Sequence, residues 1–136
     1  MPELPEVETF KRYLDKTSLK QLITDIQVTD NRILNTDEIY LKESLKSKRF
    51  ESSTRHGKYL LVYLKPRYLV MHFGMSGDLE YFDKNEVPPK FSKVIFKFNN
   101  GFNLAYISIR MFGKVAITNS IEEFIKSKKL GPDATK

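Results

Sequence analysis

The stretch Tyr59-Leu60-Leu61-Val62-Tyr63-Leu64-Lys65-Pro66-Arg67-Tyr68-Leu69-Val70-Met71-His72-Phe73 decides the fold class. It contains two apolar runs of strand length, residues 59–64 and 68–73. Pro66-Arg67 between the runs is a turn signal. We therefore predict two neighbouring strands at the centre of a β-rich protein.

The β pattern continues on both sides of this stretch, from Arg49 to Val115. The runs Val94–Phe98 and Phe102–Tyr106 flank Asn99-Asn100-Gly101, a sequence that favours a β-hairpin. The apolar residues in the segment 23–28 indicate another strand. The central part of the chain is therefore expected to consist mainly of strands.

Helices are predicted outside and between these strands. Apolar residues recur at helical spacing over residues 5–16. A short helix is expected at 37–46, with Thr36 as its N-cap. The capping box Ser120-Ile121-Glu122-Glu123 begins a final helix, which Gly131-Pro132 ends. The predicted fold class is mainly β (α+β): a two-sheet β-sandwich flanked by an N-terminal helix and a C-terminal helix.

Length, composition and charge limit the classes of function. With 136 residues and 40% hydrophobic residues, the chain can bury the core of one domain. It has no cysteine and only two histidines, which excludes zinc-finger and Fe–S ligation within it. No apolar run has the length of a membrane span, and the acidic start is not a signal peptide. The net charge of +6 suits a polyanionic partner, but it equally suits ordinary solubilising charge.

Pro2 is the first candidate for chemistry. Methionine before proline is normally removed, so the mature chain is expected to begin with a free secondary amine. The pKa of an α-amino group is about 8, so an uncharged fraction can attack an electrophilic carbon. Glu3 is adjacent and can supply a proton. The alternative is structural, with Pro5 as the first helical residue and the acidic residues in the first turn. Residues 1–9 leave both interpretations open.

Four blocks, in this order and spacing, resemble the N-terminal domain of the formamidopyrimidine-DNA glycosylase / endonuclease VIII family. They are Pro2-Glu3-Leu4-Pro5-Glu6-Val7-Glu8, His56-Gly57-Lys58-Tyr59-Leu60, His72-Phe73-Gly74-Met75-Ser76-Gly77 and Arg110-Met111-Phe112-Gly113. The family consists of bifunctional base-excision repair enzymes that act on oxidised bases. The resemblance covers the whole chain.

The resemblance implies a covalent mechanism at the N-terminus. The Pro2 nitrogen attacks C1′ of a flipped nucleotide, displaces the base and leaves an iminium to the sugar. Strand cleavage by β- and then δ-elimination follows. Glu3 matches the proton donor, and Lys58 matches an active-site lysine that holds phosphates or donates a proton. Glu6 matches a second acidic position that orders the site, although simple first-turn placement explains it equally well.

The resemblance also implies DNA contacts. Met75, Arg110 and Phe112 match a trio that fills the space left by the flipped nucleotide, with Arg110 donating to the opposite base. His72 is assigned to the DNA-contacting residues and, from its place at a strand end, to structural hydrogen bonds. Lys93 is expected to contact a phosphate, and His56 could do so as well.

The chain departs from the family pattern at two places. Ser108 stands where the best-known members have an aspartate two residues before the arginine, which weakens the expected bracing of the Arg110 loop. Phe91 replaces a histidine of the kind that contacts DNA, and Lys93 is the residue that could restore a phosphate contact.

The expected organisation is a catalytic domain at residues 1–130 and a linker stub at 131–136, with the family's second half absent. Any zinc would belong to that second half, so we expect no cofactor in this chain. The expected partner is double-stranded DNA with an oxidised base or an abasic site. We expect the protein to be a monomer in the cytoplasm, to be associated with the nucleoid and to have no membrane partner. A non-catalytic module that binds damaged DNA is the alternative function.

Overall fold

Two four-stranded antiparallel sheets form the body of the protein in the computed structural model, which describes residues 4–74, 76–110 and 113–128. The first sheet has the strand order β1-β6-β7-β5, and the second has the order β2-β3-β4-β8. The elements in chain order are α1 (Leu4–Thr17), β1 (Ile23–Val28), the 3-10 helix η1 (Asn31–Ile33), α2 (Glu38–Leu45), β2 (Ser52–His56), β3 (Tyr59–Tyr63), β4 (Tyr68–His72), β5 (Gly77–Asp83), β6 (Ser92–Phe98), β7 (Phe102–Ser108), β8 (Lys114–Thr118) and α3 (Ile121–Ser127). The predicted two-sheet β-sandwich, with one helix before it and one after it, is confirmed.

The core lies between the two sheets and is shared by both. In β3, β4, β6 and β7, alternate residues face this core, as the period of two requires. Phe50, just before β2, packs edge-on against Phe96 and Phe98 of β6, with ring centroids 5.6 and 5.7 Å apart. α1 packs against β2, β3 and β5, and α2 packs against β1 and β8. Both helices therefore contribute to a single apolar cluster with the strands.

Local sequence signals agree with the observed hairpin turn and with the N-cap of α3. The predicted end of this helix, at Gly131-Pro132, is too late, because α3 ends at Ser127. Two other signals are exceptions. Asn100 and Gly101 form the predicted hairpin turn, in which Gly101 has a φ of +88° and the Asn100 side-chain oxygen accepts from the Phe102 N–H at 3.0 Å. The Ser120 hydroxyl accepts from the Glu123 N–H at 3.0 Å, so Ser120 caps α3 as predicted.

The first exception is the cap of α2. The predicted N-cap, Thr36, is wrong by one residue, because the Asp37 carboxylate accepts from the Tyr40 N–H at 3.1 Å and α2 begins at Glu38. The second is Lys58, which the apolar run directly after it predicts at the beginning of a strand. It lies instead in the turn between β2 and β3, after Gly57, which has a φ of +62°.

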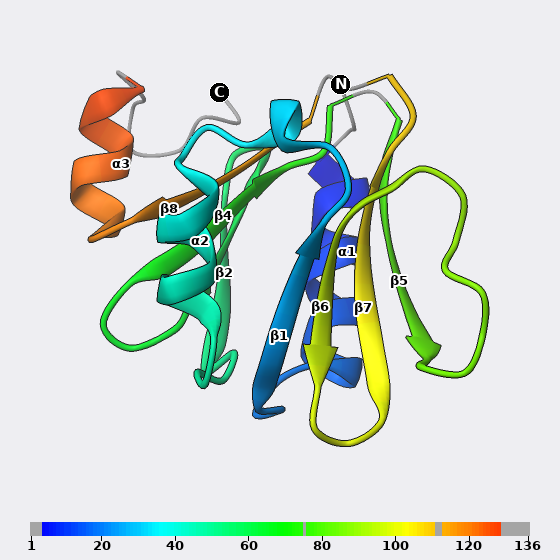
Figure 1. The fold of residues 1–136 in the computed structure, drawn as a ribbon. Coiled ribbons are helices and arrows are strands. Elements are labelled where there is room, and N and C mark those ends of the chain that lie inside the picture. The colour runs from blue at the N-terminus through cyan, green and yellow to red at the C-terminus, as the bar shows by residue number, and fades with distance from the viewer. Residues whose placement is uncertain (1–3, 75, 111–112, 129–136) are drawn as a thin grey trace.

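The loops at one end of the sandwich gather the segments on which the sequence motifs lie. Figure 1 shows that α1 begins at this end, which is uppermost in the view. β4 and β7 end there, and β5 and β8 begin there. The β6–β7 turn lies at the opposite end (Figure 1).

Candidate active site and nucleic-acid interface

Five of the nine predicted site residues fall within the part of the chain that the structure describes. These are Glu6, Lys58, His72, Lys93 and Arg110. The remaining four, Pro2, Glu3, Met75 and Phe112, lie outside the described residues. The roles assigned to all nine stay predictions.

Lys58 and His72 lie close together where β3 begins and β4 ends, in the middle of the second sheet. Tyr59, next to Lys58, pairs with His72 across β3 and β4, and its ring centroid is 5.0 Å from that of His72. Burial lowers the pKa of His72, and the positive charge of Lys58 lowers it further. Both causes favour the neutral form of the imidazole.

The expected structural hydrogen bond at His72 is made by its backbone. The Tyr106 hydroxyl, buried between the sheets, donates to the His72 carbonyl. A Cβ at Gly113 would collide with that hydroxyl and come within 2.6 Å of the same carbonyl. Glycine at 113 therefore allows β8 to begin against the Tyr106–His72 contact, which fixes the end of β4.

A pocket of about 410 Å³ lies between α1 and the first sheet at the same end of the sandwich. Its lining includes Glu6 from the first turn of α1, Ser76 and Gly77 from the start of β5, and Ile109 from the segment after β7. The Ser76 hydroxyl accepts from the Arg110 N–H at 3.1 Å, which ties the Arg110 segment to the 74–77 turn. The structure thus brings Glu6 and Arg110 to the same pocket region.

α1 is fixed to this end of the sandwich by packing and by an ion pair. The rings of Phe10 and Phe73 lie 4.3 Å apart between centroids, so α1 packs against the residue that follows His72. Glu8 pairs with Arg55 of β2 at 3.6 Å, and the Arg55 guanidinium donates to the Gly57 carbonyl at 3.0 Å. The helix that begins at Leu4 is thereby linked to the turn that carries Lys58.

Glu8 and Arg55 are positioning residues that the sequence motifs did not single out. Glu8 belongs to the N-terminal block and also pairs with Arg12, one turn along α1, at 3.5 Å. Arg55 is far along the chain, and only the fold brings it to Glu8. Tyr106 and Gly113 were missed for the same reason. Gly113 belongs to the block Arg110-Met111-Phe112-Gly113, so the presence of a glycine was the signal that could have pointed to a close contact there.

Lys93 lies apart from this pocket, near Asp30. Hydrogen bonds from Arg32 are the main cause that lowers the pKa of Asp30 to about 2, and the charge of Lys93 makes a small contribution to this shift. Phe91, two residues earlier, is half exposed, with a φ of +63°, and its carbonyl accepts from the Ser108 N–H at 3.2 Å.

No group of three or more His, Cys, Asp or Glu side chains in residues 4–74, 76–110 and 113–128 is arranged to hold a metal ion. No helix in the same ranges is long and apolar enough to cross a membrane.

The arrangement combines a carboxylate in a pocket with cations on the neighbouring loops. Glu6 lines the pocket at the start of α1, and the exposed Arg110 is tied to it through Ser76. Lys58 lies in the β2–β3 turn of the second sheet. A carboxylate can order or protonate a reacting group, and the cations can hold phosphates or donate to a base edge.

Comparisons with known proteins point to one family. The profile of the formamidopyrimidine-DNA glycosylase N-terminal domain matches residues 1–115. The formamidopyrimidine-DNA glycosylase of Streptococcus pneumoniae is 36% identical over 135 residues, which are 98% of this chain and 49% of that protein. The enzyme of the same name from Legionella pneumophila is 36% identical over 113 residues, 83% of this chain and 41% of that one.

Solved structures agree with the sequence comparison. The Lactococcus lactis Fpg in complex with an abasic site containing DNA superposes with a TM-score of 0.90 at 30% identity, over 96% of this chain and 50% of that one. The complex of a Lactococcus lactis Fpg mutant, T221P, with a Fapy-dG containing DNA gives a TM-score of 0.90 at 31% identity, over 96% and 49%. The chain spans about half the length of the relatives it matches.

Proposed function

Because this chain belongs to the formamidopyrimidine-DNA glycosylase family, we propose that it carries the catalytic half of a bifunctional DNA glycosylase/AP lyase. Its substrate is double-stranded DNA with an oxidised base or an abasic site. The Pro2 nitrogen attacks C1′, the C1′–base bond breaks, and the resulting iminium links protein and sugar. Glu3 protonates the sugar ring oxygen as the ring opens. The iminium acidifies C2′, so loss of its proton expels the 3′ phosphate, and δ-elimination then expels the 5′ phosphate.

The observation that carries this proposal is the pocket at the start of α1. Its lining combines the Glu6 carboxylate with the beginning of β5 and with Ile109, and a backbone hydrogen bond connects it to Arg110. The elements that hold it come from distant parts of the chain. Such a convergence of a polar group with a glycine-containing turn and a cationic loop supports a reactive site rather than simple first-turn placement of Glu6.

The remaining residues receive roles that fit their positions. Lys58, in the β2–β3 turn, and His72, at the end of β4, hold phosphates beside the flipped sugar. Arg110, exposed beyond β7, donates to the base left without a partner. Met75 and Phe112 wedge into the stack, and Lys93 adds a phosphate contact at the edge of the interface.

The proposal also includes the oligomeric state and the cellular location of the protein. The chain acts as a monomer, since the proposed site uses residues of one copy. It works in the cytoplasm on nucleoid DNA, where its substrate is found.

The test is borohydride trapping on a duplex with one abasic site. A chain whose mass shows that Met1 has been removed is expected to form a covalent adduct that survives denaturation. The matched control is the same chain with a short N-terminal extension, which keeps every side chain but blocks the Pro2 amine. It should form no adduct. Absence of an adduct from the chain with a free Pro2 would contradict the proposal.

The same experiment separates the alternative function. Salt-dependent retention of the abasic duplex by the wild-type chain, without any adduct, would favour a non-catalytic module that binds damaged DNA. Equal affinity for damaged and intact duplexes would count against that module.

A further inference from the structure

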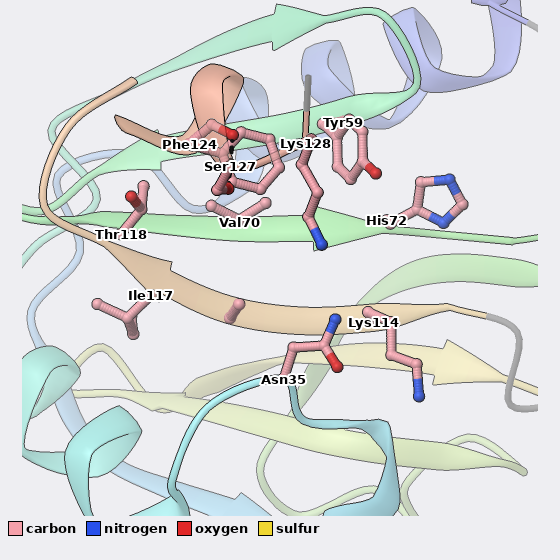
Figure 2. A pocket seen from close by; sticks show the side chains of 11 residues that line it. Asn35, Tyr59, Val70, His72, Lys114, Ile117, Thr118, Phe124, Ser127 and Lys128 are labelled. Atoms are coloured by element: carbon pink, nitrogen blue, oxygen red, sulfur yellow. Dashed lines mark hydrogen bonds between the residues drawn. The ribbon is translucent and has the colours of Figure 1, made fainter. Parts of the chain in front are cut away.

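A second cavity, of about 400 Å³, lies on the outer face of the sheet β2-β3-β4-β8, beneath α3 (Figure 2). We call it the α3 cleft. Its volume is within the range of sites that bind small molecules or single nucleotides. The lining residues on which its chemistry depends are Tyr59, Val70, His72, Lys114, Phe124 and Lys128.

One wall of the α3 cleft is aromatic. Phe124, on the face of α3 that covers the sheet, is only 6% exposed, and its ring meets that of Tyr59 edge-on at 4.8 Å. Leu61 and Val70 lie beneath Phe124 in the same apolar cluster. α3 therefore holds a flat, apolar surface beside a space large enough for a sugar or a base.

The rim of the α3 cleft is cationic. Lys114 pairs with His72 across β8 and β4, and its ammonium group donates to the Arg32 carbonyl at 3.3 Å, which holds it at the rim. Lys128 follows the last turn of α3, and Figure 2 shows its side chain extending across the cleft toward β4. Burial is the main cause of the lowered pKa of His72, and the charges of Lys58 and Lys128 add to it. Lys114 and Lys128 thus lie at the rim of the α3 cleft, and Lys58 lies near its lining residue His72.

These charges are poorly compensated. The lining of the α3 cleft contains no Asp or Glu among the described residues. None of the ion pairs between described residues includes Lys58, Lys114 or Lys128. Uncompensated cations around a concave surface raise the local concentration of anions.

We propose that the α3 cleft binds the DNA backbone next to the damaged nucleotide. Lys114 and Lys128 each neutralise a phosphate, and the sugar between the phosphates lies against Tyr59 and Phe124. This inference rests on the proposed function and extends its interface, because His72 is shared by the α3 cleft and the end of the sandwich that holds the reactive pocket. The continuity through His72 favours DNA over a free nucleotide. The DNA then passes from the N-terminal end of α1 across β4 and β8 to α3.

The test compares two double variants that lose the same charge. Lys114→Gln/Lys128→Gln removes the proposed contacts. The matched control, Lys84→Gln/Lys97→Gln, removes two lysines that line a shallow pocket near the β6–β7 turn, at the opposite end of the sandwich. Affinity for a duplex with a stable abasic-site analogue is measured as a function of salt, and circular dichroism verifies the fold of each variant.

Each phosphate contact contributes about 0.9 to the slope of log K against log salt. The slope of Lys114→Gln/Lys128→Gln is therefore expected to be smaller than that of the wild type by about 2. Between about 50 mM and about 200 mM salt, the wild type should lose roughly tenfold more affinity than this variant. The control should keep the wild-type slope.

Three outcomes would overturn the inference. The first is an unchanged slope in Lys114→Gln/Lys128→Gln, and the second is an equal reduction in the control, which would indicate a general charge effect. The third is loss of deoxyadenosine monophosphate binding in the variant with an unchanged DNA slope, which would make a free nucleotide the occupant.

Failure of the proposed function gives a different result. The expected change in slope without any borohydride adduct would support the α3 cleft as a DNA site and reject the catalytic proposal. A wild-type chain that binds no DNA at low salt would reject both.

Discussion

Ser108 is the residue at which the chain departs from its family next to the proposed DNA-contacting Arg110. Its side chain is fully buried, and its hydroxyl has no hydrogen-bond partner among the described residues. Only its backbone is used, through the N–H that donates to the Phe91 carbonyl. A buried hydroxyl without a partner costs about 1–3 kcal/mol in stability. Ser108 therefore stabilises the loop through its backbone and weakens the fold through its side chain.

The substitution Ser108→Ala is expected to raise the free energy of unfolding by about 1 kcal/mol, because it removes the unpaired hydroxyl and keeps the backbone bond. Urea unfolding measures the change. Ser53→Ala is the matched control, since the Ser53 hydroxyl donates to the Asp15 carboxylate and its loss should lower stability by about 1.5–3 kcal/mol. A loss of stability in Ser108→Ala would show that the hydroxyl has a partner.

Residue types in short blocks were sufficient to propose Lys58, His72 and Arg110 as site residues, and their roles stay predictions. The contacts that position them were not predictable in this way. The Glu8–Arg55 pair and the Tyr106–His72 hydrogen bond each join residues from different elements. They depend on the register of the strands and on where α1 packs, which local patterns do not specify.

At the scale of elements, α3 depends on its cap and on one apolar anchor. The helix has seven residues, too few to be stable in water by itself. Ser120 satisfies the Glu123 N–H, and Phe124 packs on Tyr59. The Thr118 hydroxyl also donates to the Ser120 carbonyl at 3.1 Å, which fixes the connection from β8. The α3 cleft therefore exists only while this short helix is folded.

The substitution Ser120→Ala should destabilise α3 by about 1 kcal/mol through loss of the cap. Amide hydrogen exchange in α3 is then expected to become about fivefold faster, with β4 and β8 unchanged. Ser120→Asp retains an acceptor at the cap and should keep the wild-type rate. Faster exchange throughout the sheet would contradict local unfolding, as would an unchanged rate in α3.

Elements with local signals were predicted best. The hairpin at Asn99–Gly101 and the cap of α3 follow from side chains that contact backbone groups two or three residues away. The cap of α2 was misplaced by one residue, because Thr36 and Asp37 are both good N-caps and the chain direction before the helix decides between them.

At the scale of the molecule, the sequence predicted a sandwich but not the strand order. β1 pairs with β6, which lies about 70 residues later in the chain. The first sheet therefore depends on a pairing between segments that are far apart in the sequence. The placement of α3 over the outer face of the second sheet was equally unpredictable, and with it the α3 cleft. The strand order and the placement of α3 both follow from the packing of apolar surfaces that are distant in the sequence. The local sequence pattern does not show which of these surfaces pack together.

The two sheets are expected to unfold as one unit, because they share a core. Phe50 lies just before β2 of the second sheet, and its ring packs on Phe96 and Phe98 of the first. Phe50→Ala should therefore lower the free energy of unfolding by about 3–5 kcal/mol. The control Phe50→Leu, which refills most of the space, should cost clearly less.

Cooperativity is measured by two probes of urea unfolding. Far-UV circular dichroism follows the sheets, and tyrosine fluorescence reports on tertiary packing, since the chain has seven tyrosines and no tryptophan. Both probes should give the same midpoint in the wild type and in Phe50→Ala, with an unchanged dependence on urea concentration. Separate transitions in the variant would show that the sheets are independent units. In that case the loops of both sheets that form the proposed site would not be held in place by one core.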